Sequence, residues 1–191
     1  GFAADVEPHE YEQLERLLTG DYATEERILL DVEVIKEDGS KHYLAVNDAV
    51  VARGQLSKTI DLHLSLDGDE ISKYRADGLL FATPTGSTAY SLSAGGPILA
   101  PKMECILMTP VCPHSLFSRS VLFSGESELS VHVKIPEECC CVLTIDGEKN
   151  VPILATDRVV IRKSDLKLKL ALLHNRNFYK LLNEKLKERD F

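Results

Sequence analysis

The sequence lacks several features that would point to common classes of protein. No apolar run approaches the roughly 20 residues that span a bilayer, so we expect no transmembrane helix. Basic residues are not in excess, since 22 lysines and arginines stand against 30 aspartates and glutamates, a formal net charge of −8. Such a charge argues against a nucleic-acid binder. The first seven residues lack the basic segment that begins a signal peptide. We therefore expect a cytoplasmic protein that binds neither membranes nor nucleic acid.

Metal-binding cysteine patterns are absent as well. The five cysteines include the run Cys139-Cys140-Cys141, but no CxxC pair and no cysteine and histidine spacing typical of a zinc site occurs. Alternate side chains of a strand point to the same face, so Cys139 and Cys141 would share one face and Cys140 the other. We expect these thiols to be small buried side chains in a reducing compartment.

What the sequence does contain is a series of short alternating segments separated by Asp-Gly turns. Of its 191 residues 44% are hydrophobic and 27% charged, which is ordinary for a globular chain that can bury a core. Alternation of apolar and polar residues predicts strands. They are expected at 28–35, 42–46, 60–66, 77–82, 104–109, 127–134, 140–145, 157–162 and 166–172. Helices are expected only at 8–18, 88–94 and 177–188.

These elements predict a mainly β fold, a β-sandwich-like domain with a short ligand-site helix and a C-terminal helix. The alternation implies sheets with one buried and one solvated face. Strands and helices do not alternate along the chain, so we expect no complete α/β dinucleotide-binding unit.

The most distinctive stretch is segment 83–97, which reads Thr-Pro-Thr-Gly-Ser-Thr-Ala-Tyr-Ser-Leu-Ser-Ala-Gly-Gly-Pro. It follows an apolar strand, and Gly86 permits backbone angles that other residues resist. We expect Ser87 or Thr88 to cap the helix, which ends at Gly95-Gly96-Pro97. Free N–H groups at such a start, with few bulky side chains nearby, suit a polar and phosphorylated ligand. Close packing of a small-residue helix against a sheet explains the same pattern.

Two pairs of polar residues are further candidates for ligand contacts. Asn47-Asp48 follows a strand, and an amide beside a carboxylate can bind the two hydroxyls of a ribose. A turn at the edge of a sheet would explain this pair equally well. Arg75 and Asp77 are two residues apart, so in an extended strand they share a face, where a surface ion pair is the simpler interpretation.

Together these motifs resemble those of the NAD kinases, the ATP- or polyphosphate-dependent enzymes that make NADP. The resemblance covers essentially the whole chain and includes the helix around Phe178 to Leu182. It rests on the following residues in the family's order: Asn47-Asp48, Arg75-Ala76-Asp77-Gly78, Thr83 to Tyr90, Ser93 to Pro97, Thr109-Pro110, Cys112-Pro113-His114-Ser115 and Asp146-Gly147. It implies that residues 1–191 are the NAD-binding C-terminal domain, which follows an α/β ATP-binding domain in the family.

The resemblance also implies which residues hold NAD. Asp48 stands where the family usually has glutamate, so its carboxylate reaches one methylene less far. Arg75 lies where the family meets a phosphate group, and guanidinium groups suit phosphate oxygens. Asp77 would accept a hydrogen bond from the nicotinamide amide or the ribose. The implied NAD-binding residues are Asn47, Asp48, Lys58, Arg75, Asp77, Thr88, Ala89, Tyr90, Ser91, Leu92, Ser93 and Glu148.

One motif of the family is missing. NAD kinases carry a Gly-Gly-Asp-Gly motif in the first domain, whose aspartate is taken as the base acting on the ribose 2′-hydroxyl, and these 191 residues contain none. Asp67-Gly68-Asp69 and Asp146-Gly147-Glu148 are turn sequences, and neither is assigned that role. We therefore assign no catalytic residue and no metal ligand, and we expect a fragment or truncated product that is inactive alone.

The reaction implied by the resemblance is transfer of a phosphoryl group to the adenosine 2′-hydroxyl of NAD. ATP with Mg²⁺, or polyphosphate, would be the donor, and the preference between NAD and NADH stays open. The family also implies a homo-oligomer, usually a tetramer, in which strands near 107–110 approach the neighbour's ligand. Two alternatives are a non-catalytic NAD(P)-binding or regulatory module and a relative of the diacylglycerol and sphingosine kinases.

Overall fold

The computed structural model describes residue 6 and residues 10–54, 59–115, 118–134, 140–174 and 177–187. The chain divides into two compact units. The larger unit comprises Ile28–Lys167, and the smaller comprises Gly1–Arg27 with Leu168–Phe191.

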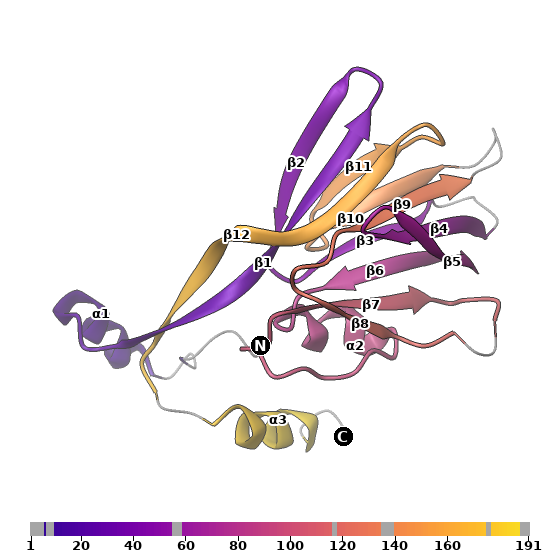
Figure 1. Cartoon of the computed structure of the whole chain (residues 1–191). Coiled ribbons are helices and arrows are strands. Elements are labelled where there is room, and N and C mark those ends of the chain that lie inside the picture. Colours follow the sequence, from indigo (N-terminus) through magenta and orange to yellow (C-terminus); the bar gives the residue numbers. More distant parts are fainter. Residues whose placement is uncertain are drawn as a thin grey trace. The chain divides into compact units, whose positions relative to one another are not determined.

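The described residues form twelve strands, as the alternation of the sequence predicts for a mainly β chain. They are β1 (Ala23–Lys36), β2 (Gly39–Ala45), β3 (Asp48–Arg53), β4 (Ile60–Leu66), β5 (Asp69–Ala76), β6 (Gly78–Ala82), β7 (Cys105–Val111), β8 (Val121–Ser124), β9 (Leu129–Lys134), β10 (Cys141–Ile145), β11 (Lys149–Ile153) and β12 (Arg158–Leu172). Two six-stranded sheets result, in the orders β2-β1-β12-β9-β4-β5 and β11-β10-β3-β6-β7-β8 (Figure 1). Every strand pair with a defined register is antiparallel.

The main core consists of inward-facing side chains from both sheets. In β4, Ile60, Leu62 and Leu64 are buried while the residues between them are partly exposed, as strict alternation predicts. Leu79 and Phe81 of β6 belong to the same core. The predicted β-sandwich-like fold is therefore confirmed.

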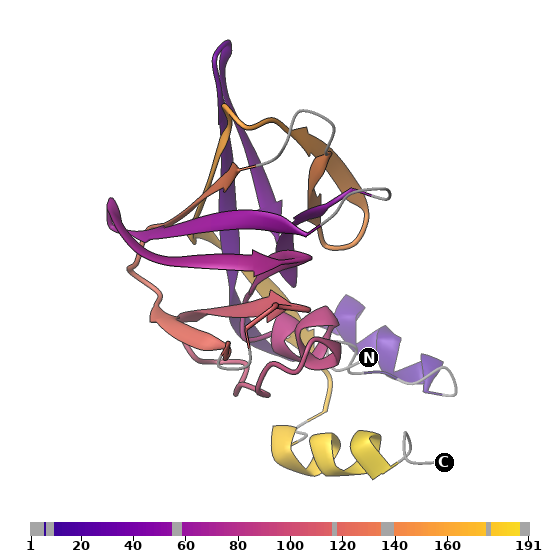
Figure 2. The same ribbon diagram turned by 90° about the vertical axis from the view of Figure 1, so that its right-hand side faces the viewer.

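The second sheet is covered on its outer face as well. All five residues of β6 are buried, because Leu80 and Ala82 pack outward into a smaller core with Val50, Leu99 and Leu107. The segment after β6 contains a 3₁₀ turn (Gly86–Thr88) and the helix α2 (Tyr90–Ser93), which lies next to β6 (Figure 2). This covering layer brings the distinctive 83–97 segment beside the polar end of β3.

Some predicted elements differ from those observed. The strands expected at 157–162 and 166–172 form one strand, β12, while β3, β5, β8 and β11 were not predicted as strands. Both β5 and β8 are sheet edges with largely exposed side chains, so burial does not impose a clear alternation on their sequences. The helix expected at 88–94 is interrupted at Ala89, whose backbone angles (φ −95°, ψ −128°) are not helical.

The smaller unit contains the N-terminal and C-terminal helices. A 3₁₀ turn (Tyr11–Leu14) leads into α1 (Glu15–Thr19), which ends at Gly20 in a left-handed conformation (φ 74°). The helix α3 (Phe178–Lys187) matches the expected C-terminal helix. Residues 8 and 9 of the first predicted helix lie outside the described residues. None of the helices in the described part of the chain is long and apolar enough to cross a bilayer.

The cysteines are only partly as expected. The four described cysteines are free thiols, and burial raises the pKa of Cys105 and raises that of Cys141 to about 12. Cys112 and Cys140, by contrast, are exposed. Both lie just beyond a strand end, Cys112 after β7 and Cys140 before β10. Cys139 lies outside the described residues.

Candidate functional site

A cavity of about 400 Å³ opens where the start of β3, the turn between β10 and β11, and the start of α2 meet. We call it the Asp48 cavity. Its lining residues are Asn47, Asp48, Val50, Ala52, Ala89, Tyr90, Thr144, Asp146 and Gly147. Four of the twelve predicted NAD-binding residues, Asn47, Asp48, Ala89 and Tyr90, are thus brought together from two separate stretches of sequence.

The backbone of the Asn47-Asp48 segment is held on its N–H side by a single carboxylate. Oδ2 of Asp146 accepts the N–H of Val46 at 2.8 Å. Oδ1 accepts the N–H of Asn47 at 2.7 Å and that of Asp48 at 3.0 Å. Three consecutive backbone donors therefore converge on the Asp146 side chain.

The carbonyl side of the same segment is held by Thr83 and by the backbone of Asp146. The Thr83 hydroxyl donates to the carbonyl of Val46 at 2.7 Å, and its N–H donates to that of Asn47 at 2.9 Å. The Asp146 N–H donates to the carbonyl of Asp48 at 2.9 Å. All six backbone polar groups of residues 46–48 thus have a partner, which fixes the direction in which the Asn47 and Asp48 side chains leave the chain.

A close approach of two backbones completes this arrangement. A Cβ added at Gly86 would lie 1.9 Å from the carbonyl oxygen of Asn47. No side chain fits at that distance, so the 83–97 segment can pack against the Asn47-Asp48 segment only because residue 86 is glycine.

Asp48 is a buried carboxylate with an altered acidity. The residue is 5% exposed, and desolvation raises the pKa of its carboxyl, with a further contribution from the negative charge of Asp146. The resulting pKa is about 6, compared with an ordinary value of 3.8. Asp48 therefore changes its protonation state close to neutral pH.

The turn before α2 uses its own backbone donors and does not leave them free. The N–H of Gly86 donates to the Thr83 hydroxyl, and those of Ser87 and Ala89 donate to carbonyls within the turn. The Ser87 hydroxyl donates to the carbonyl of Pro84 at 2.7 Å, and neither turn nor helix has a side-chain cap. The expected cap by Ser87 or Thr88 is therefore wrong. The N–H groups of Gly86, Ser87 and Ala89 are not free, because the Thr83 hydroxyl and carbonyls of the turn accept them.

The remaining predicted residues of this segment differ in their surroundings. Ala89, Tyr90 and Ser93 are exposed, while Thr88 and Leu92 are half-buried. Ser91 is fully buried, and its hydroxyl lies 3.2 Å from that of Thr109, which in turn lies 3.0 Å from that of Ser120. The side chain of Ser91 is therefore part of a buried chain of hydroxyl groups.

Glu148 lies at the edge of the same region. It is exposed in the turn between β10 and β11, directly after Gly147, which lines the Asp48 cavity. Its N–H donates to the carbonyl of Ile145 at 3.0 Å, as expected of a tight turn.

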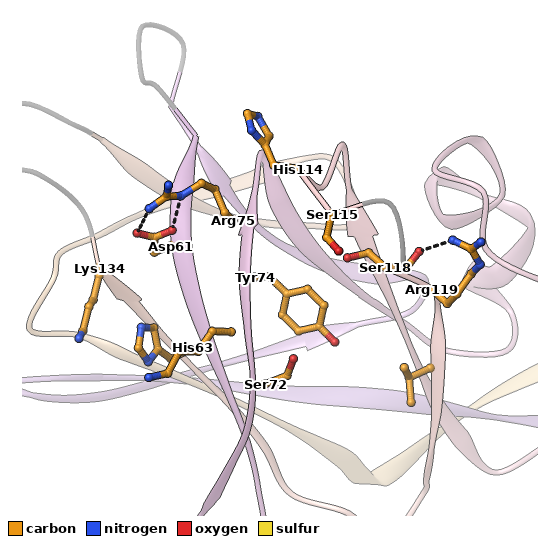
Figure 3. A pocket seen from close by; sticks show the side chains of 12 residues that line it. Asp61, His63, Ser72, Tyr74, Arg75, His114, Ser115, Ser118, Arg119 and Lys134 are labelled. Atoms are coloured by element: carbon orange, nitrogen blue, oxygen red, sulfur yellow. Dashed lines mark hydrogen bonds and ion pairs between the residues drawn. The ribbon is translucent and has the colours of Figure 1, made fainter.

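A second and larger cavity, of about 990 Å³, contains Arg75 (Figure 3). We call it the Arg75 cavity. It wraps around β5, the edge strand of the first sheet, and reaches the segment that follows β7. Its lining residues are Asp61, His63, Ser72, Lys73, Tyr74, Arg75, His114, Ser115, Ser118, Arg119, Val121 and Lys134. Four lysines and arginines against one aspartate make this surface basic in a chain whose net charge is −8.

Arg75 and Asp77 do not act as a pair. The guanidinium of Arg75 donates to both oxygens of Asp61, at 2.8 and 3.0 Å (Figure 3). Asp77 instead accepts from Arg53, at 2.7 and 3.3 Å. The expectation that they share the face of one strand is wrong, because β5 ends at Ala76 and the chain then passes from the first sheet to the second. Lys58 lies outside the described residues.

Sequence reasoning missed two residues that shape the Asp48 cavity. Asp146 was treated only as part of a turn, and Thr83 only as the first residue of the 83–97 segment. An Asp-Gly turn occurs in similar form at Asp67-Gly68, so local sequence could not show which of the two turns faces a cavity. No group of three or more histidine, cysteine, aspartate or glutamate side chains in the described ranges could hold a metal ion.

Residues 46–173 match the family described as the ATP-NAD kinase C-terminal domain. The chain is 40% identical over 188 residues to the NAD kinase of Natranaerobius thermophilus, covering 97% of this chain and 65% of that protein. It is 40% identical over 190 residues to the NAD kinase of Magnetococcus marinus, covering 97% of this chain and 62% of that protein. The chain thus spans less than two thirds of the length of these relatives.

Solved structures are similar over nearly all of the chain. The yeast NADH kinase complexed with NADH has a TM-score of 0.87 at 27% identity, covering 98% of this chain and 57% of that one. An NAD kinase from Archaeoglobus fulgidus in complex with ATP has a TM-score of 0.81 at 26% identity, covering 98% of this chain and 70% of that one.

Proposed function

The chain belongs to the NAD kinase family through its ATP-NAD kinase C-terminal domain, and we propose that it supplies the NAD site of an enzyme that makes NADP. The reaction would transfer a phosphoryl group from ATP or polyphosphate to the adenosine 2′-hydroxyl of NAD. A structural relative was solved with NADH and another with ATP, which supports nucleotide substrates of this kind.

The observation that carries the proposal is the placement of Asn47 and Asp48 beside Tyr90 in one cavity. A carboxylate can accept hydrogen bonds from both hydroxyls of a ribose, and a neighbouring amide can donate and accept. The exposed ring of Tyr90 provides an aromatic face for a base. The small side chain of Ala89 beside it does not obstruct the base. The cavity therefore offers the groups that a nucleoside requires.

The other predicted residues do not line the Asp48 cavity, and we assign them contacts around it. Thr88 and Ser93 would contact the base from the turn and helix, and Glu148 would contact the ligand from the mouth of the cavity. Asp77 and Lys58 are retained as proposed NAD contacts on the resemblance alone. The buried side chain of Ser91 and the half-buried side chain of Leu92 would support the helix from within.

The chain's own part in the reaction would be binding and orientation. Phosphoryl transfer depends on holding the attacking hydroxyl in line with the donor and on stabilising the transferred group. Asp48 and Asn47 would fix the ribose, and with it the position of the 2′-hydroxyl. The described residues contain no group of three or more histidine, cysteine, aspartate or glutamate side chains that could hold a metal ion. Magnesium would accompany the phosphates of ATP.

We further propose that the protein works as a homo-oligomer. Arg75 lies in the Arg75 cavity and not among the residues of the Asp48 cavity. Arg75 would therefore contact the phosphate of the NAD bound to a neighbouring copy more easily than that of the NAD bound to its own copy. A homotetramer would provide such neighbours, with β7 near residues 107–110 approaching the second copy's ligand.

The proposed setting is cytoplasmic NADP biosynthesis. The four described cysteines are free thiols, in keeping with a reducing compartment.

Calorimetric titration of the 191-residue protein with NAD tests this function, and we expect saturable binding that weakens in D48A. Sphingosine serves as the control ligand, since a lipid kinase relative would bind it and would not bind NAD. An assay with NAD, ATP and Mg²⁺ should show no turnover by the chain alone. Absence of NAD binding would exclude the proposed site. Binding without turnover after an ATP-binding domain of the family is added would indicate a regulatory module.

A further inference from the structure

Two Asp-Gly turns of the larger unit have the same local geometry. Asp67 and Asp146 both adopt left-handed backbone angles (φ 50° and 49°), and each is followed by a glycine with positive φ. In both turns the aspartate N–H donates at 2.9 Å to a backbone carbonyl of another segment, that of Glu128 or of Asp48. In both the carboxylate also accepts backbone N–H groups from that segment.

The two turns differ in what the carboxylate holds. Asp67 accepts one N–H, that of Glu128 at 2.9 Å, and lines neither of the two cavities. Asp146 accepts three, from Val46, Asn47 and Asp48, and lines the Asp48 cavity. Asp146 therefore holds two more backbone groups than Asp67 does, and all three of its donors lie in the segment that carries the Asn47 and Asp48 side chains.

We propose that Asp146 is a positioning residue for NAD, which acts by holding the Asn47-Asp48 segment in its ligand-binding conformation. The proposal rests on the proposed NAD site. Asp146 would not need to touch NAD, because it acts through the backbone of the residues that do. Preorganised side chains of this kind lower the conformational cost of binding.

The charge of Asp146 has a second consequence for the same site. It contributes, after desolvation, to the raised pKa of the Asp48 carboxyl. Replacing Asp146 by asparagine keeps the shape of the side chain and its Oδ1 acceptor for Asn47 and Asp48, but presents an NH₂ group to the N–H of Val46. D146N therefore removes the charge and one contact out of three.

The test compares D146N with the matched variant D67N in the 191-residue protein. We expect D146N to raise the Kd for NAD about tenfold, because the segment loses one of the three hydrogen bonds that hold it. D67N should leave the Kd within twofold of the wild-type value. The titration of the Asp48 carboxyl can be followed by ¹³C NMR in the protein without NAD. Its midpoint should lie at lower pH in D146N than in the wild type, and should be the same in D67N as in the wild type.

The outcomes separate the inference from the function on which it rests. If the wild-type protein does not bind NAD, the proposed function is wrong. If it binds NAD and D146N behaves like D67N in both Kd and the Asp48 titration, Asp146 is only a turn residue. Loss of the fold in D146N with D67N intact would show that Asp146 serves the fold as a whole, and would also overturn the proposal.

Discussion

Asp48 and Asp146 are joined by two hydrogen bonds, one in each direction. The N–H of Asp48 donates to Oδ1 of Asp146 at 3.0 Å, and the N–H of Asp146 donates to the carbonyl of Asp48 at 2.9 Å. The fold thereby holds two carboxylates beside one cavity, although their charges repel and Asp48 is buried. The unliganded protein carries the free-energy cost of burying the ionised Asp48 carboxylate, and a ligand that donates hydrogen bonds to Asp48 would reduce this cost.

This cost leads to a prediction about stability and pH. Because the pKa of Asp48 rises from 3.8 to about 6 on folding, the folded state favours the protonated form. Its contribution to stability is present below pH 3.8 and is lost as the pH rises through about 6. D48N should therefore be more stable than the wild type at pH 7.5, by on the order of 2 kcal/mol, and nearly equal at pH 4. Thermal denaturation at both pH values measures this, and an advantage that does not depend on pH would contradict it.

The same carboxyl predicts how NAD binding depends on pH. The ionised form of Asp48 accepts two hydroxyl donors, whereas the protonated form accepts fewer. The affinity of the wild-type protein for NAD should therefore increase as the pH rises through about 6, where Asp48 ionises. Calorimetric titrations between pH 5 and 8 measure this. D48N is the control, and a rise of the same size in that variant would assign the effect to another group.

Gly86 should tolerate no side chain, whereas Gly68 has room for one. In G86A the new Cβ would meet the Asn47 carbonyl at 1.9 Å, so the 83–97 segment must move away from the Asn47-Asp48 segment. We expect a loss of about 3 kcal/mol in the free energy of unfolding and loss of NAD binding. G68A is the matched control, since its Cβ meets nothing within 4 Å and only the positive φ is unfavourable. Urea denaturation of both variants distinguishes them, and equal losses would argue against the close approach.

Arg162 should matter more for stability than Arg75. Arg162 of β12 donates to Glu33 at 3.0 Å and to Glu128 at 2.8 Å, and it holds the pKa of Glu33 below its usual value of 4.5. R162A should lower the free energy of unfolding by about 1 kcal/mol at pH 7, with the effect fading as the pH falls below 4.5 and through the lowered pKa of Glu33. R75A removes an exposed pair and should leave the melting temperature unchanged. Denaturation at pH 7 and pH 4 provides the measurement, and a larger effect of R75A would contradict this order.

Ser91 should act on stability and not on ligand binding. Its buried hydroxyl lies against Thr109, so S91A leaves the Thr109 hydroxyl with Ser120 as a neighbour. We expect a loss of about 1 kcal/mol with the Kd for NAD within twofold of the wild-type value. S93A is the comparison, because Ser93 is exposed on the same helix. A large change in Kd for S91A with unchanged stability would restore the role predicted for Ser91 from the resemblance.

Much of the fold followed from local pattern. The alternation of 60–66 predicted β4 to the residue, and the Asp-Gly sequences predicted the turns at 67–68 and 146–147, because side-chain period and turn conformation are local properties. Edge strands such as β5 were missed, since exposure on both faces leaves no period to detect. The interruption at Ala89 was missed because the hydroxyl of Thr83 binds the turn.

The sequence by itself determined the strand periodicity, the turns and the motifs that identify the family. Only the tertiary structure decided which polar residues meet. Arg75 pairs with Asp61 across β4 and β5, while Asp77 pairs with Arg53, because the chain changes sheets between them. The same holds for Asp146, which lies 98 residues from Asp48 along the chain. Its role depends on sheet order, since that order places one Asp-Gly turn, and not the other, beside the start of β3.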